Sequence, residues 1–374
     1  MAYYLNEVRS ISELKQFIRF PMGLYRDNEF YVPPLMDFEL STLDRKKNPA
    51  FDHADARYWV VKDETNKIVG RVAGIILNAE LEKEGKVRFG WIDFIDDFEV
   101  SKLLLNSVTA WGKEKGATRL HGPMGFTDID FEGSLIEGFD FMATQATIYN
   151  YPYYNDHYER YRLNKAVDWV ERRGLAPDKF SDRLPRINRI VREKYGFKSL
   201  DAKKKKTLKA YAPEIFELLN TTYSDLYGYY PLSKKQIDYY TDQYFGFIRK
   251  DFVSIVLDEQ DNIAGMAICI PSISRGLRKA KGRLFPFGFI HILRDFYSNH
   301  TMDLFLIGVL PKYQKSGVNA VVLHDIVAGL IKNKVRFTAT GPMLEGNTNV
   351  QNLWKEFSEI TDNQIKRRCY IKNI

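Results

Sequence analysis

The sequence predicts an α+β protein, with helices around α/β mixed sheets, built from two copies of one fold. Segments with strand and helix patterns alternate along the chain, and three short sequence patterns recur in the same order in both halves. The 374 residues suffice for two domains of ordinary size, each able to bury its own core. We therefore expect two domains in tandem, each a mixed central β-sheet flanked by helices.

The first recurring pattern joins Leu-Tyr to a stretch with Tyr and Pro, at residues 24–35 and 226–232. The second, at 60–70 and 255–265, reads as a strand, a polar turn and a second strand entered through glycine. The third is Gly-Pro-Met, which ends a strand that follows an amphipathic helix in each half. Three matches in one order indicate an internal repeat.

The first half shows the element order that we expect for both halves. Strands are expected at residues 6–10, 58–63, 69–77, 87–94, 118–122 and 165–172, and helices at 11–25, 34–43, 97–115 and 155–161. The helix at 97–115 has acidic residues at its N-terminus and one apolar face, made of Val100, Leu103, Leu104, Val108 and Trp111.

A basic helix at 184–195 separates the halves. We therefore expect an N-terminal domain at 1–175, a linking segment at 176–197 and a C-terminal domain at 198–374.

Composition restricts the class of protein. No segment approaches about 18 uninterrupted apolar residues, and the N-terminus lacks the pattern of a signal peptide. Cys269 and Cys369 stand in apolar strand contexts, so we expect buried thiols and a cytoplasmic location. The six histidines have no metal-ligand spacing, and no metal is expected.

The most informative stretch is 303–323, an apolar strand that breaks at Pro311 and leads through a short polar loop into an apolar helix. The start of a helix presents unpaired N–H groups and the positive end of the helix dipole, which favour an anion. Lys312 and Lys315 add positive charge, and Gly317 allows close approach of the backbone. An ordinary strand-to-helix turn would show the same local features.

The residues Gln314, Lys315, Ser316, Gly317, Val318 and Asn319 resemble the pyrophosphate loop of the GNAT acyl-CoA N-acyltransferases. This resemblance implies a GNAT fold in each half and acetyl-CoA or another acyl-CoA as the acyl donor. It also implies that the strand edge from Ile307 to Val309 pairs with the pantetheine amides. Asn319 departs from the family, which usually has Gly or Ala there.

The other family signature lies near the C-terminus. Asn347 matches a residue that contacts the pantetheine arm or caps the helix, and the cap is the more ordinary role. Trp354 stands where the family often has the Tyr that protonates the departing thiolate, whereas Tyr158 has that place in the first half. Asp303 and Glu345 are candidates for the general base, with solvated surface carboxylates as the alternative.

The two halves differ at the expected phosphate position. The first half has Asp96 and Asp97 there and no glycine, so it should not bind coenzyme A at this point. It is lengthened instead at 125–149, whereas the second half has an insertion at 272–300. We therefore expect one active copy and one supporting copy.

The insertion of the second half combines basic and aromatic residues at 275–297. It is interpreted as a lid that packs on its own domain, a lid over the acceptor, or a peripheral membrane contact. RNA is less favoured because no RNA-binding signature is present, and no DNA partner is expected.

These features predict an acyl-CoA-dependent N-acyltransferase, of the N-acetyltransferase type, that acts on a small-molecule or peptide amine by direct attack. The alternatives are a non-catalytic tandem-GNAT ligand-binding protein and an aminoacyl-tRNA-dependent transferase of the Fem type. The acceptor, the acyl chain length and the oligomeric state do not follow from the sequence.

Overall fold

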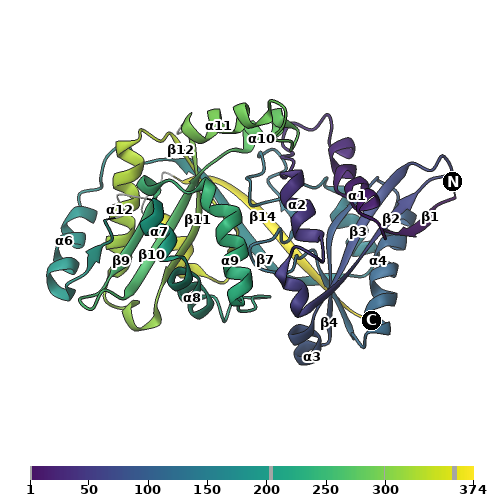
Figure 1. The fold of residues 1–374 in the computed structure, drawn as a ribbon, viewed down its shortest axis with the longest axis horizontal. Helices are drawn as coiled ribbons and strands as arrows, with labels where there is room; N and C mark the ends of the chain where they lie inside the picture. Colours follow the sequence, from purple (N-terminus) through teal and green to yellow (C-terminus); the bar gives the residue numbers. More distant parts are fainter. Residues whose placement is uncertain (1, 202–204, 299, 356–359) are drawn as a thin grey trace. The chain divides into compact units, whose positions relative to one another are not determined.

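The protein was analysed as a computed structural model, in which residues 2–201, 205–298, 300–355 and 360–374 are described (Figure 1). It contains two compact units. Unit 1 comprises Met1–Val170, Ser274–Ile292 and Ile365–Ile374, and unit 2 comprises Glu171–Ile273 and Leu293–Gln364. The units therefore differ from the expected ranges, because residues 274–292 and 365–374 of the second half belong to unit 1.

The first half of the chain forms the elements in the predicted order, with two additions, the helix α3 and the strand β6. The elements are β1 (Tyr4–Glu7), α1 (Ile11–Leu24), α2 (Met36–Leu43), β2 (Ala54–Lys62), β3 (Ile68–Leu77), α3 (Asn78–Glu84), β4 (Lys86–Phe94), α4 (Phe98–Glu114), β5 (Arg119–Gly122), β6 (Ser134–Glu137), α5 (Tyr153–Arg160) and β7 (Asn164–Leu175).

The second half repeats the order of the strands, has one more helix between its first two strands, and has two helices, α10 and α11, in the predicted insertion where the first half has α3. After α6 (Leu184–Tyr195) come β8 (Lys198–Ser199), α7 (Lys205–Ala210), α8 (Ala212–Thr222), α9 (Lys234–Tyr244), β9 (Val253–Leu257), β10 (Ile263–Pro271), α10 (Ser274–Ala280), α11 (Gly288–Ser298), β11 (Thr301–Val309), α12 (Val318–Lys332), β12 (Phe337–Thr340), β13 (Met343–Leu344), α13 (Thr348–Lys355) and β14 (Ile360–Asn373).

The sheet of unit 1 has the strand order β1-β2-β3-β4-β5-β14. Its β4–β5 pair is parallel, and the other pairs in this order are antiparallel. Helix α4 packs on β2, β3 and β4 through the predicted face, with Val100, Leu104 and Val108 fully buried. This confirms the amphipathic pattern and places the N-terminus of α4 beside the end of β4.

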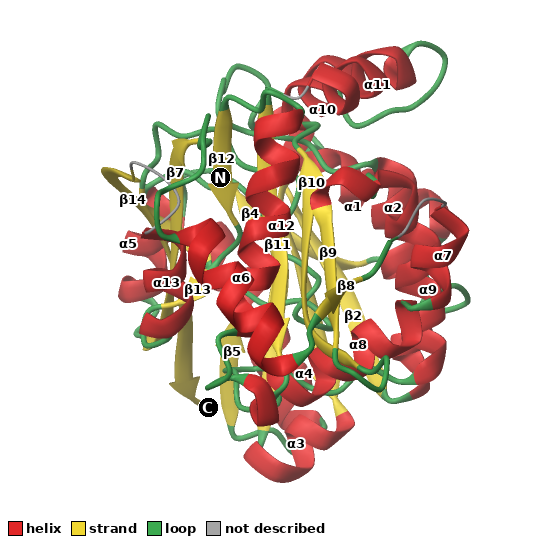
Figure 2. Ribbon diagram, turned by 90° about the vertical axis from the view of Figure 1, so that its left-hand side faces the viewer, coloured by secondary structure: helices red, strands yellow, loops and turns green. Residues whose placement is uncertain are grey.

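The sheet of unit 2 has the order β7-β12-β11-β10-β9-β8, in which residues 173–175 of β7 pair with β12. Its β11–β12 pair is parallel. Helices cover both faces: α12 packs on β9 and β10, with α6 beside it, and α8 packs on β10 and β11 (Figure 2). Strand residues alternate between the two cores, since Val256 joins the α12 side whereas Ile255 and Leu257 join the α8 side.

The internal repeat extends to the hydrogen bonds of one turn. In the β2–β3 turn, the Asp63 carboxylate accepts from the amides of Thr65 and Lys67, and Asn66 has a φ of 63°. In the β9–β10 turn, Asp258 accepts in the same way from residues two and four positions on, and Asp261 has a φ of 63°. The predicted duplication is therefore present in three dimensions.

Candidate active site

The predicted anion loop lies in unit 2, between β11 and α12. A short 3-10 helix, Pro311–Tyr313, turns the chain, and α12 begins directly after Gly317, whose φ is 82°. A Cβ on this residue would lie 2.9 Å from a methyl group of Val191 in α6. Both the left-handed backbone and this close packing therefore require glycine.

The amides of the loop are open to an external anion. Ser316 Oγ accepts from the Val318 amide at 3.3 Å, and α12 has no other side-chain cap. Within the described ranges, no acceptor is found for the amide N–H groups of Lys315, Gly317 and Asn319. These groups and the helix dipole make a positive site that a pyrophosphate would complete.

The loop itself is anchored to the turn of the neighbouring β9–β10 hairpin. The Tyr313 hydroxyl donates to the Asp258 carboxylate, and Lys312 Nζ lies 4.0 Å from that carboxylate. The side chains of Gln314 and Lys315 are exposed. Lys315 is thus the cation of the loop that is available to a ligand, whereas the charge of Lys312 is partly balanced by Asp258.

The open edge of β11 lies next to this loop. Strands β11 and β12 pair only over Thr301–Leu304 and Phe337–Thr340, and they separate beyond this point. The Leu310 amide donates to β10, so the peptide groups of Val309 and Ile307 point to the other side. Their carbonyls accept instead from side chains, Ile307 from the Tyr223 hydroxyl at 3.1 Å and Val309 from Gln314 at 3.5 Å.

Asp303 lies on β11 one residue before the two strands separate. It is 4% exposed, and in the described part of the chain neither carboxylate oxygen has a hydrogen-bond partner. Burial raises the pKa of Asp303 to about 7, although Arg173 and Ser272 oppose the shift. A buried carboxyl whose pKa is close to neutral pH is suited to act as a general base. Its burial also argues against the alternative of a solvated surface carboxylate.

The other candidates of the second half have more ordinary surroundings. Glu345 is exposed. The Asn347 side chain accepts from the Val350 amide at 3.4 Å at the start of α13, which is the capping role considered for it. The side chain of Trp354 lies outside the described residues.

The equivalent strand-to-helix turn of unit 1 lies between β4 and α4, and here the start of the helix is capped by a carboxylate. Asp97 caps α4 and accepts from the Glu99 amide at 2.9 Å and from the Tyr3 hydroxyl at 2.7 Å. Asp96 lies 3.1 Å from His157 Nε2. The N-terminus of α4 is thus capped by the protein's own Asp97. That coenzyme A does not bind here stays a prediction.

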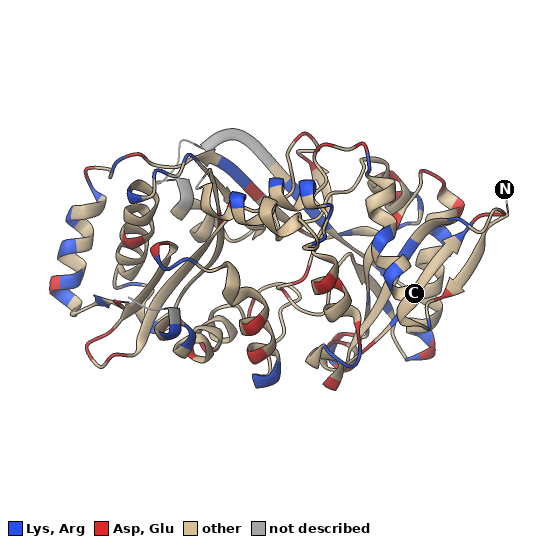
Figure 3. Cartoon of the chain, turned by 45° about the horizontal axis from the view of Figure 1, so that its top comes forward, with Lys and Arg blue, Asp and Glu red and all other residues tan. Residues whose placement is uncertain are grey.

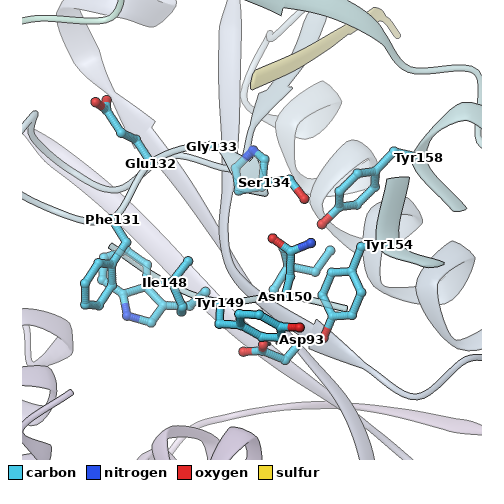
Figure 4. A pocket seen from close by; sticks show the side chains of 13 residues that line it. Asp93, Phe131, Glu132, Gly133, Ser134, Ile148, Tyr149, Asn150, Tyr154 and Tyr158 are labelled. Carbon is cyan, nitrogen blue, oxygen red and sulfur yellow. Dashed lines mark hydrogen bonds between the residues drawn. The ribbon is translucent and has the colours of Figure 1, made fainter. Parts of the chain in front are cut away.

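Tyr158 lies in unit 1, in a cavity of about 30 Å³ beside β4 (Figure 4). Its hydroxyl and that of Ser134 point toward one another, and in the described residues neither has a hydrogen-bond partner. Burial raises the pKa of Tyr158 well above its usual value, so the hydroxyl stays protonated. The cavity has room for about two water molecules, which is too little for an acyl chain.

The walls of this cavity come largely from the lengthened segment at 125–149 and the residue that follows it. Ser134 and Asn150 contribute polar groups, and the Asn150 side chain fixes the wall by hydrogen bonds to both backbone groups of Leu135. These residues could not be identified from the sequence, because they follow no periodic pattern. The only sequence feature that pointed to this region was the extra length of the segment at 125–149.

Unit 1 also has a buried carboxylate, Asp93, and this one has both an ion-pair partner and hydrogen-bond donors. Asp93, at the end of β4, forms an ion pair with Arg71 at 2.7 Å and accepts from the Tyr25 hydroxyl at 3.0 Å. The Tyr154 hydroxyl approaches the same carboxylate at 3.4 Å. Asp93 is therefore a structural centre of unit 1 and contrasts with Asp303 in unit 2.

Comparisons with known proteins agree with this architecture, although no known family model matches the chain. The chain is 29% identical to protein YghO of Escherichia coli (strain K12) over 371 residues, which cover 94% of this chain and 92% of that protein. It is 26% identical to a bacterial ceramide synthase of Caulobacter vibrioides over 320 residues, which cover 83% of this chain and 81% of that protein.

A solved structure shows the same arrangement of elements. The tandem GNAT protein from the clavulanic acid biosynthesis pathway superimposes with a TM-score of 0.56 at 12% identity, covering 100% of this chain and 98% of that chain. Together with the duplicated turn and the matching element order of the two halves, this likeness identifies the architecture. The chain has a tandem GNAT-like fold.

Proposed function

We propose that the protein is an acyl-CoA-dependent N-acyltransferase whose donor site lies in unit 2. The observation that carries this proposal is the open N-terminus of α12, where Gly317 begins the helix without a carboxylate cap and Lys315 is exposed. Residues 314–319 would hold the pyrophosphate of coenzyme A on their amides. The pantetheine arm would lie along the β11 edge at Ile307 and Val309. The side chains of Tyr223 and Gln314, which donate to these two carbonyls, would have to move aside.

Asp303 is proposed as the base that removes a proton from the acceptor ammonium. The free amine nitrogen then attacks the thioester carbonyl, the new C–N bond forms and the C–S bond breaks. The nitrogen loses its second proton as the amide forms and the leaving sulfur takes up one proton, so the products are an amide and a free thiol, with the first proton on Asp303. Tyr158, the candidate for the acid that the sequence offered, keeps its hydroxyl protonated but is fully buried in unit 1. It is therefore not assigned a part in this step, and the Tyr158→Phe variant tests the role.

The similarity to a protein named bacterial ceramide synthase favours a particular acceptor class. A ceramide is the amide of a fatty acid and a long-chain amino alcohol, so we propose a long-chain acyl donor and an amphiphilic amine acceptor. A short acyl group with a polar amine remains the alternative that the fold equally accommodates.

The test is release of free thiol from acyl-CoA donors of increasing chain length, each with a long-chain amino alcohol or a short polyamine. We expect thiol release that requires both substrates, with amide formation checked by mass spectrometry. Asp303→Asn should lower the rate at least about a hundredfold, whereas Glu345→Gln serves as the matched control. A loss confined to Glu345→Gln would assign the base to that residue instead. Absence of both transfer and coenzyme A binding would contradict the proposal and favour a non-catalytic protein.

A further inference from the structure

The insertion at 274–298 carries an exposed apolar surface that the proposed acyl transfer does not use. Helices α10 and α11 lie side by side and are joined by a loop (Figure 2). A Cβ on Gly276 of α10 would lie 2.6 Å from the carbonyl oxygen of His291 in α11, which shows how closely the helices approach. The loop is held in unit 1, because the Met36 amide donates to the Gly282 carbonyl at 3.0 Å.

The inward side of this helix pair is buried, and the rest of its apolar surface is not. Leu277, Ile292 and Phe296 are 3%, 5% and 7% exposed. The large apolar side chains that remain exposed are Phe285 (76%), Phe287 (68%), Phe289 (38%), Ile290 (52%), Leu293 (48%) and Tyr297 (67%). All six lie within one loop and one helix, and Ile290, Leu293 and Tyr297 share one face of α11 at helical spacing. Exposed apolar side chains gathered in this way usually mark an interaction site.

The same segment is strongly basic. Residues 274–298 contain six Lys and Arg residues and one acidic residue, Asp295. Arg275, Lys279, Lys281, Arg283 and Arg294 are exposed (Figure 3 colours basic residues blue). In the described part of the chain none of these five forms an ion pair, so their charges are available to an anionic partner.

We infer that the surface formed by α10, α11 and their loop binds an anionic lipid bilayer. Aromatic side chains suit the interface, aliphatic Ile290 and Leu293 suit the acyl region below it, and the basic residues suit anionic headgroups. The helix lies in the plane of the membrane, since among the described residues no helix is long and apolar enough to cross it.

Charge and composition favour the bilayer over two other occupants. A second copy of this surface would bring two basic segments together and repel. RNA would use the cations and the aromatic rings, but it would leave Ile290 and Leu293 exposed to water. A bilayer satisfies the apolar and the charged parts together.

The test is sedimentation of the full-length protein with vesicles of phosphatidylcholine containing about 30% phosphatidylglycerol. We expect binding to these vesicles, much weaker binding to pure phosphatidylcholine, and loss of binding near 0.5 M NaCl. The double variant Phe285→Ser, Phe287→Ser should reduce binding at least tenfold. Both side chains are largely exposed, so its thermal unfolding should match that of the unmodified protein.

The matched control is Ile187→Ser, Ile190→Ser in α6, another basic helix with two exposed apolar side chains (44% and 47%). We expect this control to bind vesicles normally. Absence of vesicle binding by the unmodified protein, or loss in the control alone, would overturn the inference. It would also be overturned if the Phe variant changed the oligomeric state in sedimentation velocity while vesicle binding stayed the same. These vesicles contain no acyl-CoA, so the outcome is independent of the proposed function.

Discussion

The helices α4 and α12 follow equivalent strands in the two halves, and they begin in opposite electrostatic environments. Asp97 caps α4 internally and Asp96 stands beside it, whereas α12 begins at Gly317 with Lys315 exposed nearby. One fold element has therefore been retained twice, with its anion site filled by side chains in unit 1 and open in unit 2. The difference shows that a duplicated GNAT-like fold can keep its scaffold while the charge at the start of the equivalent helix changes.

A second contrast concerns two buried carboxylates on the corresponding strands β4 and β11. Asp93 is paired with Arg71 and hydrogen-bonded to tyrosine hydroxyls, whereas the Asp303 carboxylate oxygens have no hydrogen-bond partner within the described ranges. Asp93 is thus placed to stabilise unit 1. Ionisation of Asp303 lowers the stability of the protein, because the charge is buried.

The largest expected effect is the change in stability when either buried carboxylate, Asp93 or Asp303, is replaced by Asn. The change should have opposite signs at the two positions. Asp93→Asn leaves buried Arg71 without its counter-charge and should lower the free energy of unfolding by about 3–5 kcal/mol. Asp303→Asn removes an unpaired buried charge and should raise it at pH 8. Chemical denaturation of both variants measures the difference. Equal destabilisation by the two changes would remove the contrast between the sites.

The same contrast predicts a pH dependence. The pKa of Asp303 is raised to about 7, above its unfolded value near 4, so the native state holds this proton more tightly. Its contribution to stability is therefore full below about pH 4 and is lost as the pH rises toward 7, by about 4 kcal/mol at most. Catalysis should change in the opposite direction, because the base must be ionised. Rates measured from pH 5 to pH 9 should rise through about pH 7, and Asp303→Asn should remove this rise.

The next effect is on coenzyme A binding. Gly317→Glu places a carboxylate at the open N-terminus of α12 and should weaken binding at least a hundredfold, about 2.7 kcal/mol, in calorimetric titration. Gly116→Glu is the matched control, since Gly116 also has a positive φ (89°) but stands exposed in unit 1 with no atom within 4 Å of an added Cβ. Equal losses in both variants would point to strain alone. Unchanged binding in Gly317→Glu would place the donor elsewhere.

A smaller effect on stability is expected from changes to two tyrosines that line the cavity of unit 1, Tyr154 and Tyr158. Tyr154→Phe removes a hydroxyl whose oxygen lies 2.7 Å from that of Tyr25 and accepts from the Phe94 amide at 3.0 Å, so it should cost about 1–3 kcal/mol. Tyr158→Phe removes a hydroxyl without a partner in the described part of the chain and should change stability little. Thermal unfolding and steady-state rates should be compared for both. A rate loss of a hundredfold or more in stable Tyr158→Phe would assign it as the acid; an unchanged rate would remove that role.

The smallest effect is expected at the filled site. Asp97→Ala removes the cap of α4 and should lower the free energy of unfolding by about 1 kcal/mol without changing coenzyme A affinity. Tyr3→Phe keeps the cap and loses only one hydrogen bond, so it should cost less. A new coenzyme A site in Asp97→Ala, detected by titration, would show that the carboxylate alone separates the two units.

Much of this architecture could be predicted because it rests on local patterns. The period of apolar residues identified α4, the recurrence at 60–70 and 255–265 identified the duplicated hairpins, and Pro311 and Gly317 identified the strand-to-helix turn. Cys269 and Cys369 are buried free thiols, as their apolar contexts predicted. The carboxylates at the start of α4 were also visible in the sequence, since they lie within one turn of the helix that they cap.

Only the tertiary structure decided the features that depend on contacts between distant segments. It placed residues 274–292 and 365–374 with unit 1, paired Asp93 with Arg71, and left Asp303 buried without a partner in the described residues. It also showed that Gly317 is required by Val191 from α6, more than 120 positions away. Local propensity and helical period act over a few residues, whereas burial and pairing depend on which strands the chain brings together, and a sequence pattern does not encode that directly.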